Sequence, residues 1–409
     1  STPTQIICVS FVIVIALGTM LLTLPIASRN GRLDVLNAMF TATSATCVTG
    51  LVVRDTWTQF SWFGQAVILL LIQVGGLGLV TLTSFFALAM RRRMGFRDLR
   101  LMGESVSADG YDQAKSVLKI VVGLAAAFEG IGILLLLFAF VPQFGLEGVW
   151  ISVFTAISAF CNAGFDLFGR FGAYSSLVPY VNNYYVQAVI MFMIISGGLG
   201  FMVWVELRQW YKKRRLSLHA KVVLSFSLIL WLGGALGLGL MEWNNPATLG
   251  GLPVSGKVMA ALFQSVSTRT AGMNTVDLAA CGTLSKLLMS MLQFIGAAPG
   301  STGGGVKVTT FAVLILTIRS VAQGRDDCVI ADHHIESKTV YRALTIIMLG
   351  AVAAIGSAIV VYYNTSDAVT VVDAIFESCS AFGTVGLSVG VTGQLNTGAK
   401  ILYMLVMFM

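Results

Sequence analysis

The stretch FTATSATCVTGLVVRDT, residues 40–56, decides the fold, because its pattern occurs four times in the chain. It is typical of a short helix that runs into a Thr-Gly turn. The other copies are FTAISAFCNAGFDLF (residues 154–168), FQSVSTRTAGMNTVD (residues 263–277) and FESCSAFGTVGLSVG (residues 376–390). Each copy begins with phenylalanine, carries a serine and then a glycine, and lies between long apolar segments, so an internal fourfold repeat is predicted.

The spacing of the copies gives the size of the repeated unit. Their glycines, at positions 50, 164, 272 and 386, are 114, 108 and 114 residues apart. A period above 100 residues exceeds that of solenoid repeats. It indicates four helix–loop–helix units, which could enclose an axis. The alternative is that these glycines only let membrane helices pack closely, as small residues commonly do.

The composition places the chain in a membrane. Hydrophobic residues make up 56% of the 409 residues and charged residues 11%, whereas soluble domains contain about 25% charged residues. So few charges cannot cover the surface of a soluble enzyme. The 6 cysteines show no paired spacing, so neither a disulfide framework nor a metal cluster is indicated.

The apolar runs predict eight membrane segments of about 20 residues or more. The short helix in each copy has roughly twelve residues and would span about 18 Å, which is too short to cross. We therefore expect re-entrant pore helices, which are tolerated where the backbone lines a cavity. The predicted segments are residues 5–27, 62–90, 119–141, 185–206, 221–242, 284–318, 342–363 and a last one from residue 399.

Basic residues set the expected orientation. Three loops, within residues 91–119, 208–221 and 319–342, carry 17 of the 26 Lys and Arg residues. Basic loops stay in the cytoplasm, so both termini are expected there and the four copies enter from outside. The net charge of +7 then reflects topology and not a nucleic-acid partner.

The turn of each copy is the predicted ion-binding element. Glycine permits backbone angles that leave carbonyl oxygens free to face an axis, and rings of carbonyls can replace the hydration shell of a potassium ion. One glycine per loop predicts a short filter, with no metal site beyond the potassium ion itself. The filter residues are Val48, Thr49, Gly50, Asn162, Ala163, Gly164, Thr270, Ala271, Gly272, Thr384, Val385 and Gly386.

A glycine-rich stretch in the third inner segment predicts a gate. Its glycines and proline cannot all lie in a regular helix, and an unwound membrane segment must line water or bind something. A rigid kink is the alternative. The stretches QVGGLG (residues 73–78) and ISGGLG (residues 195–200) predict milder irregularities. The gate residues are Gly296, Ala297, Ala298, Pro299, Gly300, Ser301, Thr302, Gly303, Gly304, Gly305 and Lys307, whose charge should face a cavity or a carboxylate.

Several charged residues lie near these motifs. Glu129, deep in an apolar segment, predicts either a cation site or a hydrogen bond to a neighbouring helix or partner. Acidic residues at the expected outer mouth could concentrate cations or pair with neighbouring arginines. These acids are Asp55, Asp166, Asp277 and Glu377, and the arginines are Arg54 and Arg269.

Five motifs together resemble the Trk/Ktr/HKT superfamily of potassium transporters, and within it the Ktr-type membrane subunits (the KtrB group). They are TSATCVTGLVV, ISAFCNAGF, RTAGMN, FGTVGLS and GSTGGGVKVTTF, and the resemblance covers essentially the whole chain. It implies potassium uptake with no enzymatic activity. Relatives with serine at the first filter glycine tend to favour sodium, so Gly50 points to potassium.

The resemblance also implies an assembly. It predicts a homodimer in the plasma (inner) membrane, with a cytoplasmic ring of RCK subunits of the KtrA kind on the basic loops. ATP on that ring favours an active pore and ADP an inactive one, while sodium stimulates uptake. The chain itself would hold no covalently bound cofactor. Family members also place an arginine in the fourth inner helix, beyond Met409, where the sequence is expected to be incomplete.

The fold class expected is an all-α membrane protein with four parallel helix–pore loop–helix repeats around a pseudo-fourfold, potassium-channel-like pore. The alternative function is an alternating-access secondary cation transporter, which normally shows inverted repeats and broken helices in two halves. The four units cover residues 1–90, residues 91–215 with a cytoplasmic loop, residues 216–320 with the gate, and residues 321–409 with a shortened inner helix.

Overall fold

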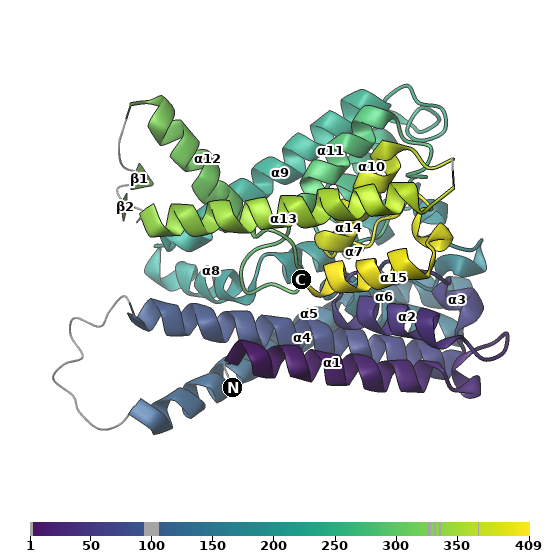
Figure 1. Ribbon diagram of the computed structural model, residues 1–409, viewed down its shortest axis with the longest axis horizontal. Coiled ribbons are helices and arrows are strands. Elements are labelled where there is room, and N and C mark those ends of the chain that lie inside the picture. The colour runs from purple at the N-terminus through teal and green to yellow at the C-terminus, as the bar shows by residue number, and fades with distance from the viewer. Residues whose placement is uncertain (1–2, 94–105, 325–328, 331–332, 335–336, 367) are drawn as a thin grey trace.

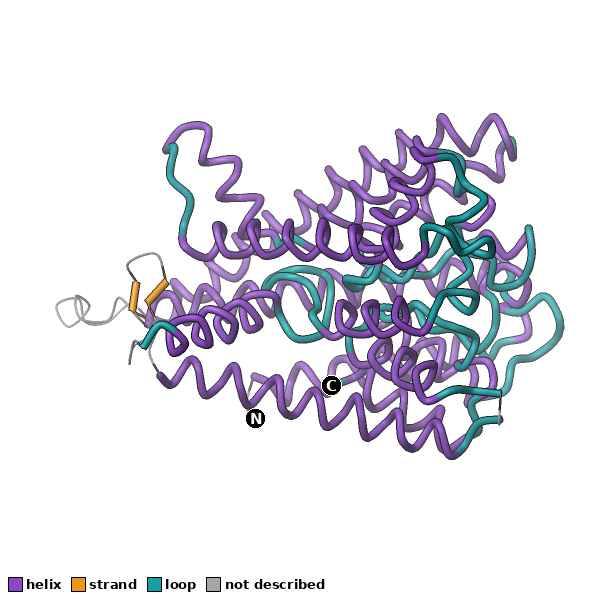
Figure 2. The backbone as a smooth tube through the Cα atoms, turned by 90° about the horizontal axis from the view of Figure 1, so that it is seen from above, coloured by secondary structure: helices purple, strands orange, loops and turns teal. Residues whose placement is uncertain are grey.

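The computed structural model describes residues 3–93, 106–324, 329–330, 333–334, 337–366 and 368–409. Most helices run along the long axis of the molecule (Figure 1), and loops gather toward one end and between the helices (Figure 2). The helices are α1 (Pro3–Leu22), α2 (Val35–Thr46), α3 (Thr56–Gln59), α4 (Trp62–Arg93), α5 (Val106–Phe144), α6 (Leu146–Phe160), α7 (Tyr184–Gly198), α8 (Phe201–Lys213), α9 (Leu218–Glu242), α10 (Val254–Ser267), α11 (Thr283–Phe294), α12 (Val308–Ala322), α13 (Ser337–Tyr363), α14 (Val371–Phe382) and α15 (Thr397–Phe408).

The four predicted short helices are α2, α6, α10 and α14, and local sequence signals set their starts. The side chain of Asp34 accepts a hydrogen bond from the backbone N–H of Asn37 and caps α2. Thr370 and Asp373 form a capping box at the start of α14. Such caps satisfy backbone N–H groups that have no partner within the helix.

The repeated phenylalanines anchor the short helices in the core. Phe40, Phe154, Phe263 and Phe376 are all fully buried. Helix α2 packs against α1 and α4, α6 against α5 and α7, and α14 against α13 and α15. Helix α10 packs against α9 and against α7 of the preceding unit. The phenylalanine recurs because each short helix needs an apolar contact with its long neighbours.

Three helices are long and apolar enough to cross a membrane within the described residues: α5 from Lys119, α9 and α13. Helices α7 and α8 qualify together, but they are bent by 98° at their junction. Shorter apolar helices among the described residues are Cys8–Leu22 of α1, Trp62–Gly78 of α4, and the whole of α6, α12 and α15. The other apolar segments of the sequence correspond to these shorter or bent helices.

The bend between α7 and α8 corrects one expectation. The sequence predicted a mild irregularity there, but Gly200 has φ 85° and the helix stops. The backbone N–H of Phe201 donates to the carbonyl of Gly300, 3.0 Å away, instead of continuing the helix. A Cβ on Gly200 would lie 2.7 Å from the carbonyl oxygen of Pro299. The break therefore makes room for the glycine-rich stretch.

A short antiparallel hairpin follows α12. It pairs β1 (Val329–Ile330) with β2 (His333–His334) within the third basic loop. Residues 325–328, 331–332 and 335–336 of that loop, and residues 94–105 of the first, lie outside the described residues.

Candidate functional site

The turns that follow the four short helices share one backbone conformation. We call residues 48–50, 162–164, 270–272 and 384–386 the repeat loops. Each begins with a non-glycine residue at positive φ, which is uncommon, and ends with a glycine at positive φ. The φ angles are 57°, 57°, 72° and 49° at Val48, Asn162, Thr270 and Thr384, and 89°, 72°, 77° and 92° at Gly50, Gly164, Gly272 and Gly386.

The repeated serine holds each repeat loop to its helix. The backbone N–H of Gly50 donates to Ser44 Oγ at 3.0 Å, and that of Gly386 donates to Ser380 Oγ at 3.1 Å. In the third copy Ser267 Oγ accepts from the N–H of Met273 at 3.0 Å. In the second, Ser158 Oγ donates to the carbonyl of Phe165 at 2.6 Å. Serine recurs because its small hydroxyl can form a hydrogen bond with a backbone N–H or carbonyl group of the turn.

The repeat loops touch one another in a closed cycle. A Cβ on Gly50 would lie 2.3 Å from the carbonyl oxygen of Ala163 in the second loop. A Cβ on Gly164 would lie 3.1 Å from the oxygen of Ala271 in the third. A Cβ on Gly272 would lie 2.3 Å from the oxygen of Val385, and one on Gly386 would lie 2.3 Å from that of Thr49. The middle residues of all four loops are therefore gathered around one centre, and only glycine fits beside them.

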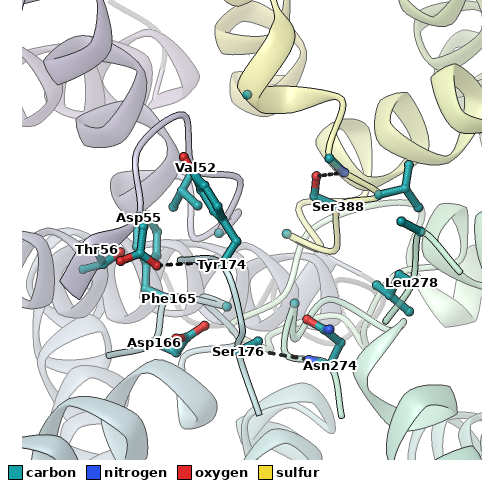
Figure 3. A pocket seen from close by; sticks show the side chains of 18 of the residues that line it. Val52, Asp55, Thr56, Phe165, Asp166, Tyr174, Ser176, Asn274, Leu278 and Ser388 are labelled. Carbon is teal, nitrogen blue, oxygen red and sulfur yellow. Dashed lines mark hydrogen bonds between the residues drawn. The ribbon is translucent and has the colours of Figure 1, made fainter. Parts of the chain in front are cut away.

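A cavity of about 300 Å³ opens on one side of this cycle. Its wall includes the four glycines, together with Asp55, Asp166 and Asp277. Figure 3 shows Asp55 and Asp166 on one side of it and Asn274 and Ser388 across from them. Burial, with the charge of Asp55 adding to it, raises the pKa of Asp166 to about 7. We call this cavity the vestibule.

Backbone amides and hydroxyls, and not arginines, bind two of the acidic groups. Asp55 accepts from the N–H of Thr58 at 2.8 Å and from that of Tyr174 at 3.0 Å. Glu377 accepts from Ser388 Oγ at 2.5 Å and from the N–H of Thr392 at 2.8 Å. Of the two alternatives given by the sequence, pairing with an arginine is therefore not supported for these two among the described residues. The ion pairs among the described residues join Arg170 to Glu147 and Lys286 to Asp373.

The glycine-rich loop, residues 296–305, lies against the repeat loops. It connects α11 to α12 and leaves the third inner segment unwound, as predicted. The backbone N–H of Gly304 donates to Thr384 Oγ1 at 3.0 Å. A Cβ on Gly303 would lie 2.2 Å from Thr270 Oγ1. The third and fourth repeat loops are thus in direct contact with this loop.

The broken second inner segment supplies further backbone partners. The N–H of Ala298 donates to the carbonyl of Gly198 at 3.1 Å, and that of Thr302 donates to Gly197 at 3.3 Å. Thr302 Oγ1 donates to the carbonyl of Phe160, the last residue of α6, at 3.2 Å. Main-chain groups that are not in a helix are thereby satisfied inside the protein, as an apolar environment demands.

Lys307 follows the glycine-rich loop and faces a second cavity, as predicted. This cavity has a volume of about 260 Å³ and is also lined by Gly304, Gly305, Cys47 and Thr384. The ammonium donates to the carbonyl of Gly303 at 2.5 Å. The described residues that line the cavity include no carboxylate, so the alternative of a structural ion pair is not supported.

Glu129 makes the predicted hydrogen bond to a neighbouring helix. Gln73 Nε2 on α4 donates to both carboxylate oxygens, at 3.0 and 3.1 Å. Sequence patterns assign Gln73 no role of its own, although it is the first residue of the QVGGLG stretch. Its Oε1 lies 3.8 Å from the sulfur of Cys161, which precedes the second repeat loop. Glu129 is therefore linked, through one amide, to the end of α6.

Comparison with known proteins places the chain in one group. The family described as "TrkH: Cation transport protein" matches residues 1–409. The chain is 35% identical over its whole length to the Ktr system potassium uptake protein B of Bacillus subtilis, covering 90% of it. It is 33% identical to the potassium/sodium uptake protein NtpJ of Enterococcus hirae, again over 100% of this chain and 90% of the relative. The crystal structure of the potassium transporter TrkH from Vibrio parahaemolyticus has the same fold, with a TM-score of 0.74 at 18% identity, over 99% of this chain and 81% of that one.

Proposed function

This chain belongs to the TrkH family of cation transport proteins, and from that premise we propose that it is the pore-forming subunit of a potassium uptake system. The closed cycle of the four repeat loops carries the proposal. The carbonyls of Thr49, Ala163, Ala271 and Val385 would replace the water around a dehydrated ion. The names of its relatives, which are potassium or potassium/sodium uptake proteins, support this substrate class.

The short helices would assist the ion electrostatically. Each of α2, α6, α10 and α14 ends at its repeat loop. A helix C-terminus carries a partial negative charge and stabilises a cation by about 0.3–1 kcal/mol. Each loop supplies one glycine in register, so the filter is short and its discrimination against sodium weaker than in a filter with several stacked rings. The vestibule, with Asp55 and Asp166 in its wall, would raise the local concentration of cations.

The glycine-rich loop would act as the gate. It is hydrogen-bonded to Thr384 and lies against Thr270, so an ion leaving the filter meets it first. Lys307 adds a positive charge to the cavity on that side, which opposes a cation until the loop and the lysine move. Displacing the loop would open a path from the filter to the second cavity.

The assembly follows the family resemblance. We propose a multi-pass protein of the plasma (inner) membrane, with both termini and the basic loops in the cytoplasm and the vestibule outside. The four repeats are those expected from the sequence. A homodimer would carry a cytoplasmic ring of RCK subunits whose ATP or ADP sets the gate, and sodium would stimulate uptake. The name "Ktr system" of several relatives, which implies more than one component, supports such a partner.

An alternating-access cation transporter is the second candidate, and the broken α7–α8 segment favours it. Such transporters use discontinuous helices in corresponding positions of two halves. Here the two breaks lie in the second and third repeats, which are neighbours in the chain; the second break is the glycine-rich loop, and the first borders it. This placement is better explained by one gate than by two moving halves.

Rubidium influx into proteoliposomes tests the proposal. We expect influx to follow the rubidium electrochemical gradient, because each ion that enters gains about 2.3 kcal/mol of free energy per 100 mV of inside-negative potential. Influx should increase when an RCK ring and ATP are added. A sodium gradient alone should not drive rubidium uphill. Uphill uptake coupled to sodium would favour the second candidate, and an absence of rubidium influx under all these conditions would refute both.

A further inference from the structure

One repeat differs from the others at the residue that precedes its repeat loop. That position holds Cys47, Cys161 and Gly383 in the first, second and fourth repeats, but Arg269 in the third. The arginine is only 4% exposed. A buried guanidinium is costly unless hydrogen bonds compensate the charge. Its contacts therefore indicate why this repeat carries it.

The guanidinium is bound by the glycine-rich loop. Arg269 Nη2 donates to the carbonyl of Gly296 at 2.9 Å. Its central carbon lies 5.4 Å from the centre of the Trp231 ring on α9. Within the described part of the chain, Nε and Nη1 have no hydrogen-bond partner. The Gly296 carbonyl is thus the one protein acceptor seen for this charge among the described residues.

In the first two repeats, the inner helix contacts the end of the short helix through backbone atoms alone, without a bridging side chain. A Cβ on Gly75 would lie 1.9 Å from the carbonyl oxygen of Thr46, and one on Gly197 would lie 1.8 Å from that of Phe160. Their inner helices therefore touch the end of the short helix directly. In the third repeat the inner segment has left the helix, and the N–H of Gly296 donates to Val306 within the loop region. Arg269 spans the gap that results.

We propose that Arg269 is a positioning residue that latches the glycine-rich loop beneath the repeat loops. This inference rests on the proposed gate. When the loop moves away, the bond from Arg269 to Gly296 breaks and a buried positive charge loses its acceptor. A charge-assisted hydrogen bond of this kind shifts a two-state equilibrium by roughly tenfold or more. The latch therefore favours the closed position of the loop.

The test compares Arg269→Met, Arg269→Lys and wild type in proteoliposomes, with the exposed Arg32 changed to Gln as the matched control. Rubidium influx and the rubidium-to-sodium influx ratio are measured without the RCK ring. We expect Arg269→Met to raise influx about tenfold with an unchanged ratio, Arg269→Lys to lie in between, and Arg32→Gln to match wild type.

Other outcomes would overturn the latch. Influx at the wild-type level in Arg269→Met, or a fall in the ion ratio without a rise in influx, would mean that Arg269 shapes the repeat loop instead. If Arg269→Met does not fold, Arg269→Lys decides the question, because its influx must still exceed that of wild type. Wild-type protein that conducts no rubidium even with the RCK ring and ATP would refute the proposed function itself, a result that the variants cannot mimic.

Discussion

Replacing Gly50 with Ser should reduce the selectivity of influx for rubidium over sodium. The residue has φ 89°, where an L-residue costs about 1–2 kcal/mol. A Cβ there would lie 2.3 Å from the Ala163 oxygen, so this oxygen must retreat by about 0.7 Å to reach even 3.0 Å. The displaced carbonyl belongs to the next repeat loop, so one side of the ring loses its position. We expect the rubidium-to-sodium influx ratio to fall at least tenfold, which is about 1.4 kcal/mol.

Gly31 offers a matched control for the backbone strain. It has φ 93°, and nothing lies within 4 Å of a Cβ placed on it. Gly31→Ser therefore carries the same strain without the contact, and its ion ratio should equal that of wild type. Both variants are purified to equal folded amounts, and both ions are measured in the same proteoliposomes. If the two variants have the same ion ratio, the carbonyl ring is not the selective element.

Three further predictions concern the gate, the vestibule and a buried carboxylate. Thr384→Val keeps the shape of the side chain but removes the hydroxyl that accepts from the Gly304 N–H. Because such a hydrogen bond contributes about 1 kcal/mol, rubidium influx without the RCK ring should rise about fivefold. Unchanged influx would contradict the gate contact. Because the pKa of Asp166 is raised to about 7, its carboxyl is neutral below that pH and charged above it. Influx at low rubidium should therefore rise between about pH 6 and pH 8, and Asp166→Asn should abolish the rise; an equal slope in both proteins would exclude Asp166 as the cause. Glu129→Leu leaves the amide of Gln73 without its acceptor and should lower the free energy of unfolding by about 1–3 kcal/mol, whereas Glu129→Gln should cost less. Identical thermal unfolding of the two variants would show that this hydrogen bond contributes little.

Much of the architecture could be predicted because the repeat is encoded locally. In each repeat the phenylalanine packs in the core and the serine forms a hydrogen bond with the backbone of the turn. Both residues lie within about ten residues of the loop glycine, so their regular spacing can be recognised in the sequence. Pro299 and its neighbouring glycines likewise break a helix by intrinsic preference alone. The resemblance to the Trk/Ktr superfamily, carried by the same motifs, is confirmed by the family match over residues 1–409.

The remaining features depend on contacts between distant segments. The helix propensities of the residues around Gly200 predict only a mild irregularity. The helix nevertheless breaks there, because the carbonyl of Gly300, about a hundred residues away in the chain, accepts the hydrogen bond of the Phe201 N–H. Arg269 stands near acidic residues in the sequence, but its side chain is bound to Gly296 instead. Gln73 lies in an apolar segment and becomes informative only when Glu129 is seen beside it. Local pattern cannot encode such pairings.

The cycle of four glycines is formed by a single polypeptide, and this affects how it can change through mutation. In an assembly of four identical chains, every substitution changes all four equivalent loops at once, so its destabilising effect is repeated four times. Here each repeat loop is encoded at its own place in the chain, so equivalent positions can hold different residues, as Val48, Asn162 and Thr384 do. If the cycle selects the ion, as we propose, its preference can change through a substitution in one repeat loop at a time, and one repeat can carry a residue, such as Arg269, that the other three lack.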